Sequence, residues 1–175
     1  LYLDLMAKKK MGDPFDEKND LGPQASLQLR DELHDQVLRI VKQGAELILG
    51  GTIPDMAGAY YPLTILRNVK PGMAAFDEEL FGPVAALIKA NDEEDAIELA
   101  NKSIFGLGAA VFTKDIERGE RIAKEKLNAG CCFVNDFVKS DPRLPFGGIK
   151  ESGYGRELSV FGIKEFVNIK SVYIK

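Results

Sequence analysis

The densest group of residues able to do chemistry lies in residues 144–157, which read Leu-Pro-Phe-Gly-Gly-Ile-Lys-Glu-Ser-Gly-Tyr-Gly-Arg-Glu. Glycine is needed where the backbone takes a positive φ or comes close to another group. A flexible Gly/Ser linker would not also carry Phe146, Arg156 and Glu157. The stretch therefore predicts a shaped loop, which is either functional or a tight structural crossover.

A second candidate is the acidic turn of residues 78–83, Glu-Glu-Leu-Phe-Gly-Pro, which directly precedes an apolar segment. A carboxylate in this turn can accept hydrogen bonds from two hydroxyls of a ribose. The neighbouring phenylalanine can pack on a planar ring. Taken alone, the segment is also typical of a solvated charged loop, so its meaning depends on the rest of the chain.

The other residue types that often do chemistry are better explained by structure. Cys131 and Cys132 fall on opposite faces of a predicted strand, and no feature supplies a base that would form a thiolate, so we interpret both as buried small hydrophobic residues. His34, the only histidine, lies among charged residues on the polar side of a predicted helix, which indicates a solvated face. The sequence contains neither a zinc-binding spacing nor a Walker A motif, and we expect no metal site.

Composition narrows the class of protein. The chain has 175 residues, of which 45% are hydrophobic and 29% charged, and its net charge is −4. The acidic balance argues against a nucleic-acid partner, and the absence of a long apolar run argues against a membrane span. Two adjacent cysteines cannot form a disulfide framework, which favours a reducing cytoplasm. The chain begins with Leu inside a predicted helix, so we expect it to be cut from a longer protein, without a signal peptide.

The elements that must position these residues alternate along the chain. Apolar spacing predicts a helix over 26–43, ended by Gly44, and short strands over 45–50 and 60–66. The remaining predicted elements are a strand at 84–89, a helix capped by Asn91, a strand at 109–112, a helix capped by Asp115 and a strand at 131–135. Strands that alternate with helices predict an α/β fold with a parallel twisted sheet and flanking helices. Ligands bind beyond the carboxyl ends of such strands, which is where the residues after Asn135 lie.

The last ten residues, 166–175, alternate strongly between apolar and polar side chains and predict a terminal strand. A terminal strand with no following helix must pair at an edge, either of its own sheet or of a partner chain. The sequence therefore divides into a main domain part, residues 1–165, and an arm, residues 166–175, through which we expect homo-oligomerisation.

Four segments together resemble the NAD(P)-dependent aldehyde dehydrogenase superfamily in their order and spacing. They are residues 78–84, 106–113, 133–135 and 145–157. The resemblance extends over essentially the whole chain. Within the superfamily it points to the succinate-semialdehyde dehydrogenase branch, through residues 10–14 (Lys-Met-Gly-Asp-Pro) and 29–34 (Leu-Arg-Asp-Glu-Leu-His). It implies that residues 1–165 are the C-terminal part of the catalytic domain and that 166–175 is the oligomerisation strand.

The resemblance also implies roles for single residues. Glu79 matches the glutamate that holds the nicotinamide ribose of NAD or NADP, and Phe81 matches the aromatic residue against the nicotinamide. In the small-molecule aldehyde site, Phe146 matches an aromatic residue of the pocket, and Glu157 matches an accessory proton relay. Residues 135–145 would form the substrate loop, where Ser140 leaves room for a polar tail and Arg143 can pair with a carboxylate.

The same resemblance implies what this chain does not supply. The nucleophilic cysteine, the general base and the dinucleotide-binding domain of the family lie upstream, and Cys131 and Cys132 do not match the nucleophile's motif. In the parent enzyme a cysteine thiolate attacks the aldehyde, hydride passes to the nicotinamide, and water hydrolyses the thioester. We therefore expect the chain alone to be inactive. The alternatives are a relative that acts on another aldehyde and a non-catalytic oligomerisation module.

Overall fold

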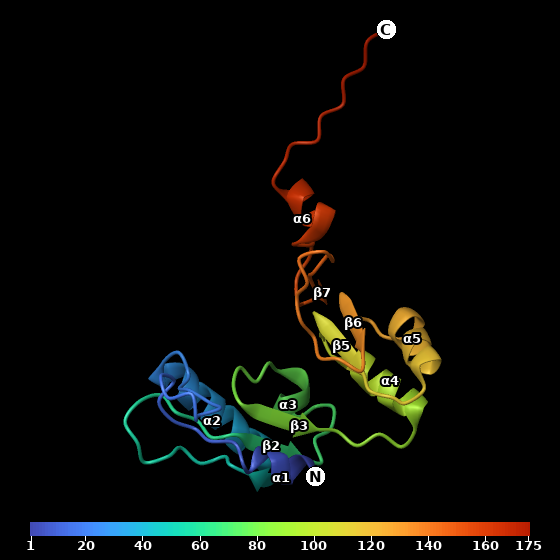
Figure 1. Ribbon diagram of the computed structural model, residues 1–175. Coiled ribbons are helices and arrows are strands. Elements are labelled where there is room, and N and C mark those ends of the chain that lie inside the picture. Colours follow the sequence, from blue (N-terminus) through green and yellow to red (C-terminus); the bar gives the residue numbers. More distant parts are fainter. The chain divides into compact units, whose positions relative to one another are not determined.

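A computed structural model describes all residues 1–175, which form two compact units, Leu1–Asn91 and Asp92–Lys175 (Figure 1). Each unit combines short strands with helices, so the mixed α/β class predicted from the sequence is confirmed. None of the helices is both long enough and apolar enough to cross a membrane.

The first unit contains a three-stranded sheet in the order β1-β2-β3. Its strands are β1 (Glu46–Leu49), β2 (Thr64–Arg67) and β3 (Val84–Leu87). Strand β1 runs antiparallel to β2, whereas β3 runs parallel to β2. The predicted strand over 60–66 begins only at Thr64, because Pro62 just before it has no N–H to donate to a ladder.

Three helices complete this unit: α1 (Tyr2–Met6), α2 (Leu27–Lys42) and α3 (Ala74–Asp77). Helix α2 follows the predicted boundaries closely. The main-chain N–H of Leu29 donates to Ser26 Oγ (3.2 Å), which caps the first turn. At the other end Gly44 takes a φ of 105°, the left-handed conformation typical of a residue just past a helix. The short helix α3 is not predicted by any periodic pattern.

The core of the first unit lies between α2 and the sheet. Leu33, Val37 and Ile40 form the buried stripe of α2 and pack in one cluster with Leu66 of β2 and with Tyr61 just before it. Figure 1 shows α2 running along the sheet. Because this stripe is almost completely buried, α2 is the fixed element against which the neighbouring turns are held.

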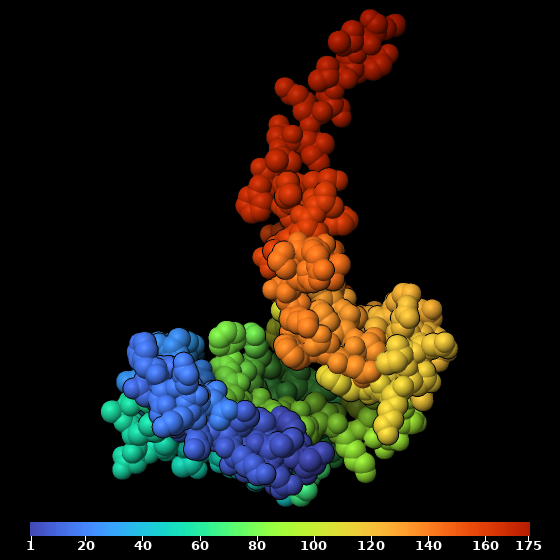
Figure 2. Space-filling model, in the orientation of Figure 1, coloured from blue at the N-terminus to red at the C-terminus, as the bar shows by residue number.

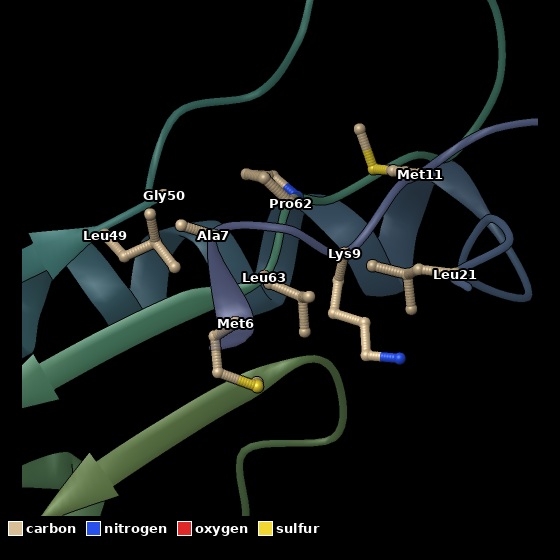
Figure 3. A pocket seen from close by; sticks show the side chains of 9 residues that line it. All are labelled: Met6, Ala7, Lys9, Met11, Leu21, Leu49, Gly50, Pro62 and Leu63. Carbon is tan, nitrogen blue, oxygen red and sulfur yellow. The ribbon is translucent and has the colours of Figure 1, made fainter. Parts of the chain in front are cut away.

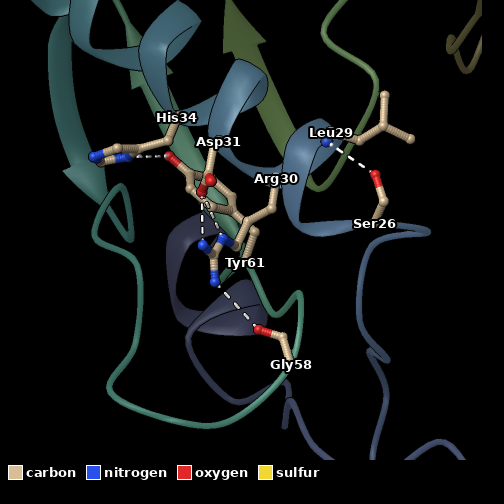
Figure 4. A network of polar contacts seen from close by, with 7 residues as sticks. All are labelled: Ser26, Leu29, Arg30, Asp31, His34, Gly58 and Tyr61. Atoms are coloured by element: carbon tan, nitrogen blue, oxygen red, sulfur yellow. Dashed lines mark hydrogen bonds and ion pairs between the residues drawn. The ribbon is translucent and has the colours of Figure 1, made fainter.

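His34 corrects one prediction. Instead of lying on a solvated face, its ring packs edge-on against Tyr61, with Nδ1 3.2 Å from the phenol oxygen (Figure 4). Burial raises the pKa of Tyr61 to about 12. The neighbouring Arg30 donates to Asp31 and to the carbonyl of Gly58, as the same view shows. The charged residues next to His34 in the sequence did not indicate its contact with Tyr61, because Tyr61 is distant in the sequence.

The second unit is built around a parallel pair of strands, β5 (Gly108–Val111) and β6 (Cys131–Val134). Helix α5 (Ile116–Glu125) connects them, which confirms the predicted strand-helix-strand crossover, and Asp115 caps it as expected. Helix α4 (Glu93–Lys102) precedes them, but its cap is Asp92 and not the predicted Asn91.

The predicted single parallel sheet is only partly correct. Strand β3 pairs with β2 and not with β5, and the strands of the chain form three separate sheets. The third is a short antiparallel pair, β4 (Phe105–Gly106) with β7 (Ile149–Lys150), and helix α6 (Ser159–Glu165) follows it. Local periodicity identified the longer strands but not β4 or β7, and it does not specify which strands are neighbours in a sheet.

Residues 166–175 form neither helix nor strand in the single chain. They extend away from the strands of their own unit (red in Figures 1 and 2), with Phe166, Ile169 and Tyr173 exposed. No edge of this chain pairs with them, and a strand requires such a partner. Pairing of this segment with another chain therefore stays a prediction.

Gly130, just before β6, lies where two stretches of main chain come together. An atom at the Cβ position of Gly130 would be 1.8 Å from the carbonyl oxygen of Gly147, which lies in the glycine-rich loop of residues 144–157. The amide N–H of Gly130 also donates to the carbonyl of Gly106 (2.9 Å). Only glycine fits here, so this contact sets the position of the loop relative to β6.

We expect Gly130→Ala in the full-length protein to lower the free energy of unfolding by about 1–3 kcal/mol, because main chain must move to admit the methyl group. Urea unfolding measures this change. Gly22→Ala is the control, since its Cβ would meet Pro14 at an ordinary 3.5 Å, and its effect should stay within about 0.5 kcal/mol. Equal stabilities for the two variants would contradict the close approach.

Candidate functional site

The turn between α3 and β3 carries the two residues expected to contact a cofactor, Glu79 and Phe81. The Phe81 side chain is 69% exposed, and Glu79 is exposed as well. An atom at the Cβ position of Gly82 would lie 2.3 Å from Leu33 Cδ2, so a glycine here lets the turn lie directly against α2. The turn thus presents both side chains outward from a fixed base.

The two adjacent glutamates of this turn have different environments. Glu78 accepts a bidentate pair of hydrogen bonds from Arg39 of α2, at 2.8 and 2.7 Å. Gln36 Nε2 donates both to Glu78 Oε2 and to the main-chain carbonyl of Glu79, each at 3.1 Å. Glu78 is therefore bound to the helix, and Glu79 is held through its main chain while its carboxylate is left to face solvent.

The hydrogen bonds from Arg39, and then those from Gln36, lower the pKa of Glu78 to about 2. A carboxyl group with a lowered folded-state pKa contributes its stability above its unfolded value. For Glu78 this contribution is present above about pH 4.5 and is lost as the pH falls through about 2. Near neutral pH the carboxylate is charged, and its partner Arg39 compensates that charge.

Glu79 and Phe81 line one pocket of about 400 Å³ beside α2. Its other lining residues come from one face of that helix: Leu29, Glu32, Leu33, Asp35, Gln36 and Arg39. The structure therefore brings the two predicted cofactor residues together. It adds Gln36 and Arg39, which sequence reasoning did not identify. Their spacing of three residues on the polar side of a helix was the available signal, but it does not show what they face.

In the second unit, Phe146 and Glu157 are adjacent although they lie at opposite ends of the glycine-rich loop. Each main-chain N–H donates to the carbonyl of the other residue, at 2.9 and 2.8 Å. Both residues line a pocket of about 400 Å³, together with Arg156 and Glu165. The loop predicted from its glycines is thus closed by its own two ends, which fixes the main chain of both predicted residues.

The charged residues inside this loop are used to hold it. Arg156 Nη1 donates to the carbonyls of Gly148 (2.9 Å) and Gly155 (2.6 Å). Lys150 Nζ donates to the carbonyls of Asn101 and Ser103, each at 2.9 Å, at the end of α4. A cation at a helix C-terminus is favourable, so this contact anchors the loop to α4.

The expected substrate loop, residues 135–145, leaves β6 through a clamp. Asn135 has a φ of 55°, and its side-chain amide exchanges two hydrogen bonds of 2.8 Å with the main chain of Thr113. Asparagine tolerates this left-handed conformation better than most residues. The loop therefore starts from a fixed point at the carboxyl end of the parallel strands β5 and β6. This is the end of a parallel sheet at which ligands are expected to bind.

Within the loop, Arg143 is already paired. Its Nε and Nη2 donate to the two oxygens of Asp141 at 2.9 and 2.6 Å. These contacts hold the pKa of Asp141 well below its ordinary value. Ser140 is exposed beside this pair. Phe146 and Asp141 line a pocket of about 410 Å³, whereas neither Ser140 nor Arg143 belongs to its lining.

Cys131 and Cys132 line this pocket too, and both are half-buried free thiols. Burial raises the pKa of the Cys132 thiol, and the neighbouring Cys131 adds to the rise. A raised pKa disfavours the thiolate of Cys132, which agrees with its interpretation as a packing group. The prediction that both cysteines are buried is wrong, because both are only half-buried beside this pocket.

A smaller pocket of about 170 Å³ lies beside α1 in the first unit (Figure 3). Its lining is mainly apolar and includes Met6 and Leu63, with Met11 and Leu21 farther along the same view. The Lys9 ammonium pairs with Asp20 at 2.6 Å. No sequence pattern indicated this pocket, and its residues offer packing rather than reactive groups.

Comparison with known proteins identifies the family of the chain. The sequence profile described as the aldehyde dehydrogenase family matches residues 2–172. The chain is 54% identical over 167 residues to the NAD(P)+-dependent succinate semialdehyde dehydrogenase Sad of Escherichia coli, covering 95% of this chain and 36% of that protein.

Solved structures give the same picture. The succinic semialdehyde dehydrogenase of Streptococcus pyogenes, in complex with NADP+, matches with a TM-score of 0.93 and 40% identity, over 98% of this chain and 37% of that one. The betaine aldehyde dehydrogenase of Staphylococcus aureus, in complex with NAD+, matches with a TM-score of 0.89 and 37% identity, over 93% of this chain and 33% of that one. The chain thus spans about a third of these relatives' lengths. It belongs to the aldehyde dehydrogenase family.

Proposed function

We propose that the protein containing this chain oxidises succinate semialdehyde to succinate with NAD+ or NADP+. The observation that carries the proposal is the turn in which the exposed Glu79 carboxylate and Phe81 ring share one pocket while α2 holds the main chain of Glu79. The names of the relatives from Escherichia coli and Streptococcus pyogenes support the choice of aldehyde.

The residues of this turn fit a nicotinamide cofactor. A carboxylate can accept two hydroxyl hydrogen bonds of a ribose, and an exposed aromatic ring can pack on a planar ring. Glu79 and Phe81 offer these two groups on the same side of one turn. The cofactor, when bound, supplies the hydride acceptor. The residues of this chain would hold and orient it.

On the substrate side, Phe146, Ser140 and Arg143 would receive the aldehyde and its carboxylate tail. Arg143 keeps this role despite its pairing, because a guanidinium has five N–H donors and Asp141 engages only Nε and Nη2. The edge that carries Nη1 is still available for a bidentate contact with a second carboxylate. Asp141 would then hold the guanidinium in place.

Glu157 would act as an accessory proton relay, since its main chain is fixed opposite Phe146 and its side chain lines the same pocket. In this proposal the nucleophilic cysteine and the general base belong to other parts of the full-length protein. Residues 166–175 would add a strand across a subunit boundary, which accounts for their exposed apolar side chains.

A second candidate function is oxidation of a different aldehyde, which the 37% identity to a betaine aldehyde dehydrogenase favours. The two candidates differ in the charge of the substrate tail, since succinate semialdehyde carries a carboxylate and betaine aldehyde a quaternary ammonium. The third candidate is that the protein is a non-catalytic oligomerisation module. Steady-state rates of the full-length protein with both aldehydes distinguish the three, because a module has no activity with either.

The role of Glu79 is tested by Glu79→Gln in the full-length protein. This change keeps the shape but removes the charged acceptor, and hydrogen bonds to charged groups contribute about 1.5–3 kcal/mol. We expect weaker NAD(P)H binding or slower hydride transfer, with an unchanged melting temperature. Glu94→Gln, on the exposed face of α4, is the control. Wild-type binding and kinetics in Glu79→Gln would return this residue to the solvated-loop interpretation.

The role of Arg143 is tested with two substrates of similar length. Arg143→Met should raise KM for succinate semialdehyde much more than KM for butyraldehyde, because only the first has a charged tail. A loss of about 1.4 kcal/mol of binding corresponds to a tenfold change. If KM rises equally for both substrates, Arg143 has a structural role only.

The isolated chain of residues 1–175 tests where the nucleophile lies. We expect no NAD(P)H production from any aldehyde, measured by absorbance, because neither the nucleophile nor the dinucleotide-binding domain is expected in this segment. Activity that persists in a Cys131→Ser/Cys132→Ser variant would refute the family assignment of roles. Activity that disappears in this variant would instead identify one of these thiols as the nucleophile.

A further inference from the structure

We propose that Gln36 and Arg39 of α2 are positioning residues for Glu79 and Phe81. They hold the turn of residues 78–81 in the orientation that presents the Glu79 carboxylate and the Phe81 ring to the pocket. The inference rests on the proposed function, in which these two side chains contact the nicotinamide half of the cofactor. It adds two residues that line the same pocket and that act through the turn.

The first argument is that α3 cannot orient the turn by itself. Helix α3 has only four residues, and its first N–H, that of Ala74, donates to Gln43 Oε1 (2.9 Å) just past α2. At its other end the N–H of Glu78 donates to the carbonyl of Ala74 (2.8 Å), and Glu78 is extended, with φ −114° and ψ 158°. The hydrogen bonds of α3 therefore end at Glu78, one residue before Glu79. Another element has to supply the constraint.

The second argument is that α2 supplies it at two consecutive residues. Arg39 donates two hydrogen bonds to the Glu78 carboxylate, of 2.8 and 2.7 Å. The Gln36 amide bridges the Glu78 carboxylate and the Glu79 carbonyl, at 3.1 Å each. Next to these two residues on α2 is the buried stripe that contains Val37 and Ile40. The turn is thus tied to one of the best-packed elements of its unit.

The third argument concerns charge. Glu78 and Glu79 are adjacent, and Glu32 and Asp35 also line the pocket, so four carboxylates lie close together. Like charges repel one another, and a released Glu78 carboxylate would compete with Glu79 for the same hydroxyl groups. The guanidinium of Arg39 compensates Glu78 and holds it against the helix. Only one of the two neighbouring glutamates is then presented to a ligand.

The test compares Arg39→Met and Arg67→Met in the full-length protein. The control breaks a pair of the same kind: Arg67 and Glu46 join the neighbouring strands β1 and β2 by two hydrogen bonds, of 2.8 and 2.6 Å. The side chains of the two pairs are similarly exposed, 53% and 46% for Arg67–Glu46 against 52% and 41% for Arg39–Glu78. Fluorescence titration with NADH and NADPH measures Kd, thermal unfolding measures stability, and steady-state kinetics separate kcat from KM.

We expect Arg39→Met to raise Kd for the reduced cofactor about fivefold, while Arg67→Met leaves Kd unchanged. The double variant Arg39→Met/Glu78→Gln should match the more impaired single variant, because the two residues act as one unit. Gln36→Leu should raise Kd as well, since it releases the Glu79 carbonyl. This variant also keeps the test decisive if Arg39→Met fails to fold.

Two results separate this inference from the function it rests on. If Glu79→Gln weakens cofactor binding while Arg39→Met and Gln36→Leu behave like Arg67→Met, the positioning role is wrong and the proposed function stands. If Glu79→Gln leaves cofactor binding and hydride transfer unchanged, the proposed contact between Glu79 and the cofactor fails, and the positioning role fails with it. Strictly additive effects of Arg39→Met and Glu78→Gln would also overturn the inference.

Discussion

Each candidate site depends on a place where the chain approaches its neighbour more closely than a side chain would allow. In the first unit Gly82 lies against Leu33 of α2, where a Cβ would be only 2.3 Å from a methyl group. In the second unit Gly130 lies against the carbonyl of Gly147, at 1.8 Å from the same hypothetical atom. Protein interiors yield little to such overlap. These contacts therefore fix the turn that carries Phe81 and the loop that carries Phe146.

The fold could be predicted as far as its signals are local. Ser26 and Asp115 begin helices because a side-chain oxygen next to an apolar periodic segment accepts main-chain N–H groups, and both caps are present. The parallel pairing of β5 with β6 follows from the helix between them. The place of β3 does not follow, because its partner β2 is chosen by packing between distant segments, and periodicity contains no information about that choice.

The sequence indicated candidate residues of the site but not the partners of those residues. The motifs pointed to Glu79, Phe81, Phe146 and Glu157, and the structure brings each pair to a shared pocket. Nothing in the sequence says that Arg143 is already paired with Asp141, because such a pair depends on loop conformation. The two residues are close in sequence, but the bidentate geometry depends on how the loop folds.

The distinction between charged residues that hold the chain and those that meet a ligand follows from their hydrogen bonds. Arg156 and Lys150 donate to main-chain carbonyls, and Arg39 donates to Glu78, so their donors satisfy acceptors of the same chain. Main-chain carbonyls need hydrogen-bond partners, so Arg156 and Lys150 support the local fold, whereas Arg39 compensates the charge of Glu78. Glu79 is different, because its main chain is the part that is held. A carboxylate on a held backbone loses less conformational freedom when it meets a ligand, which favours binding.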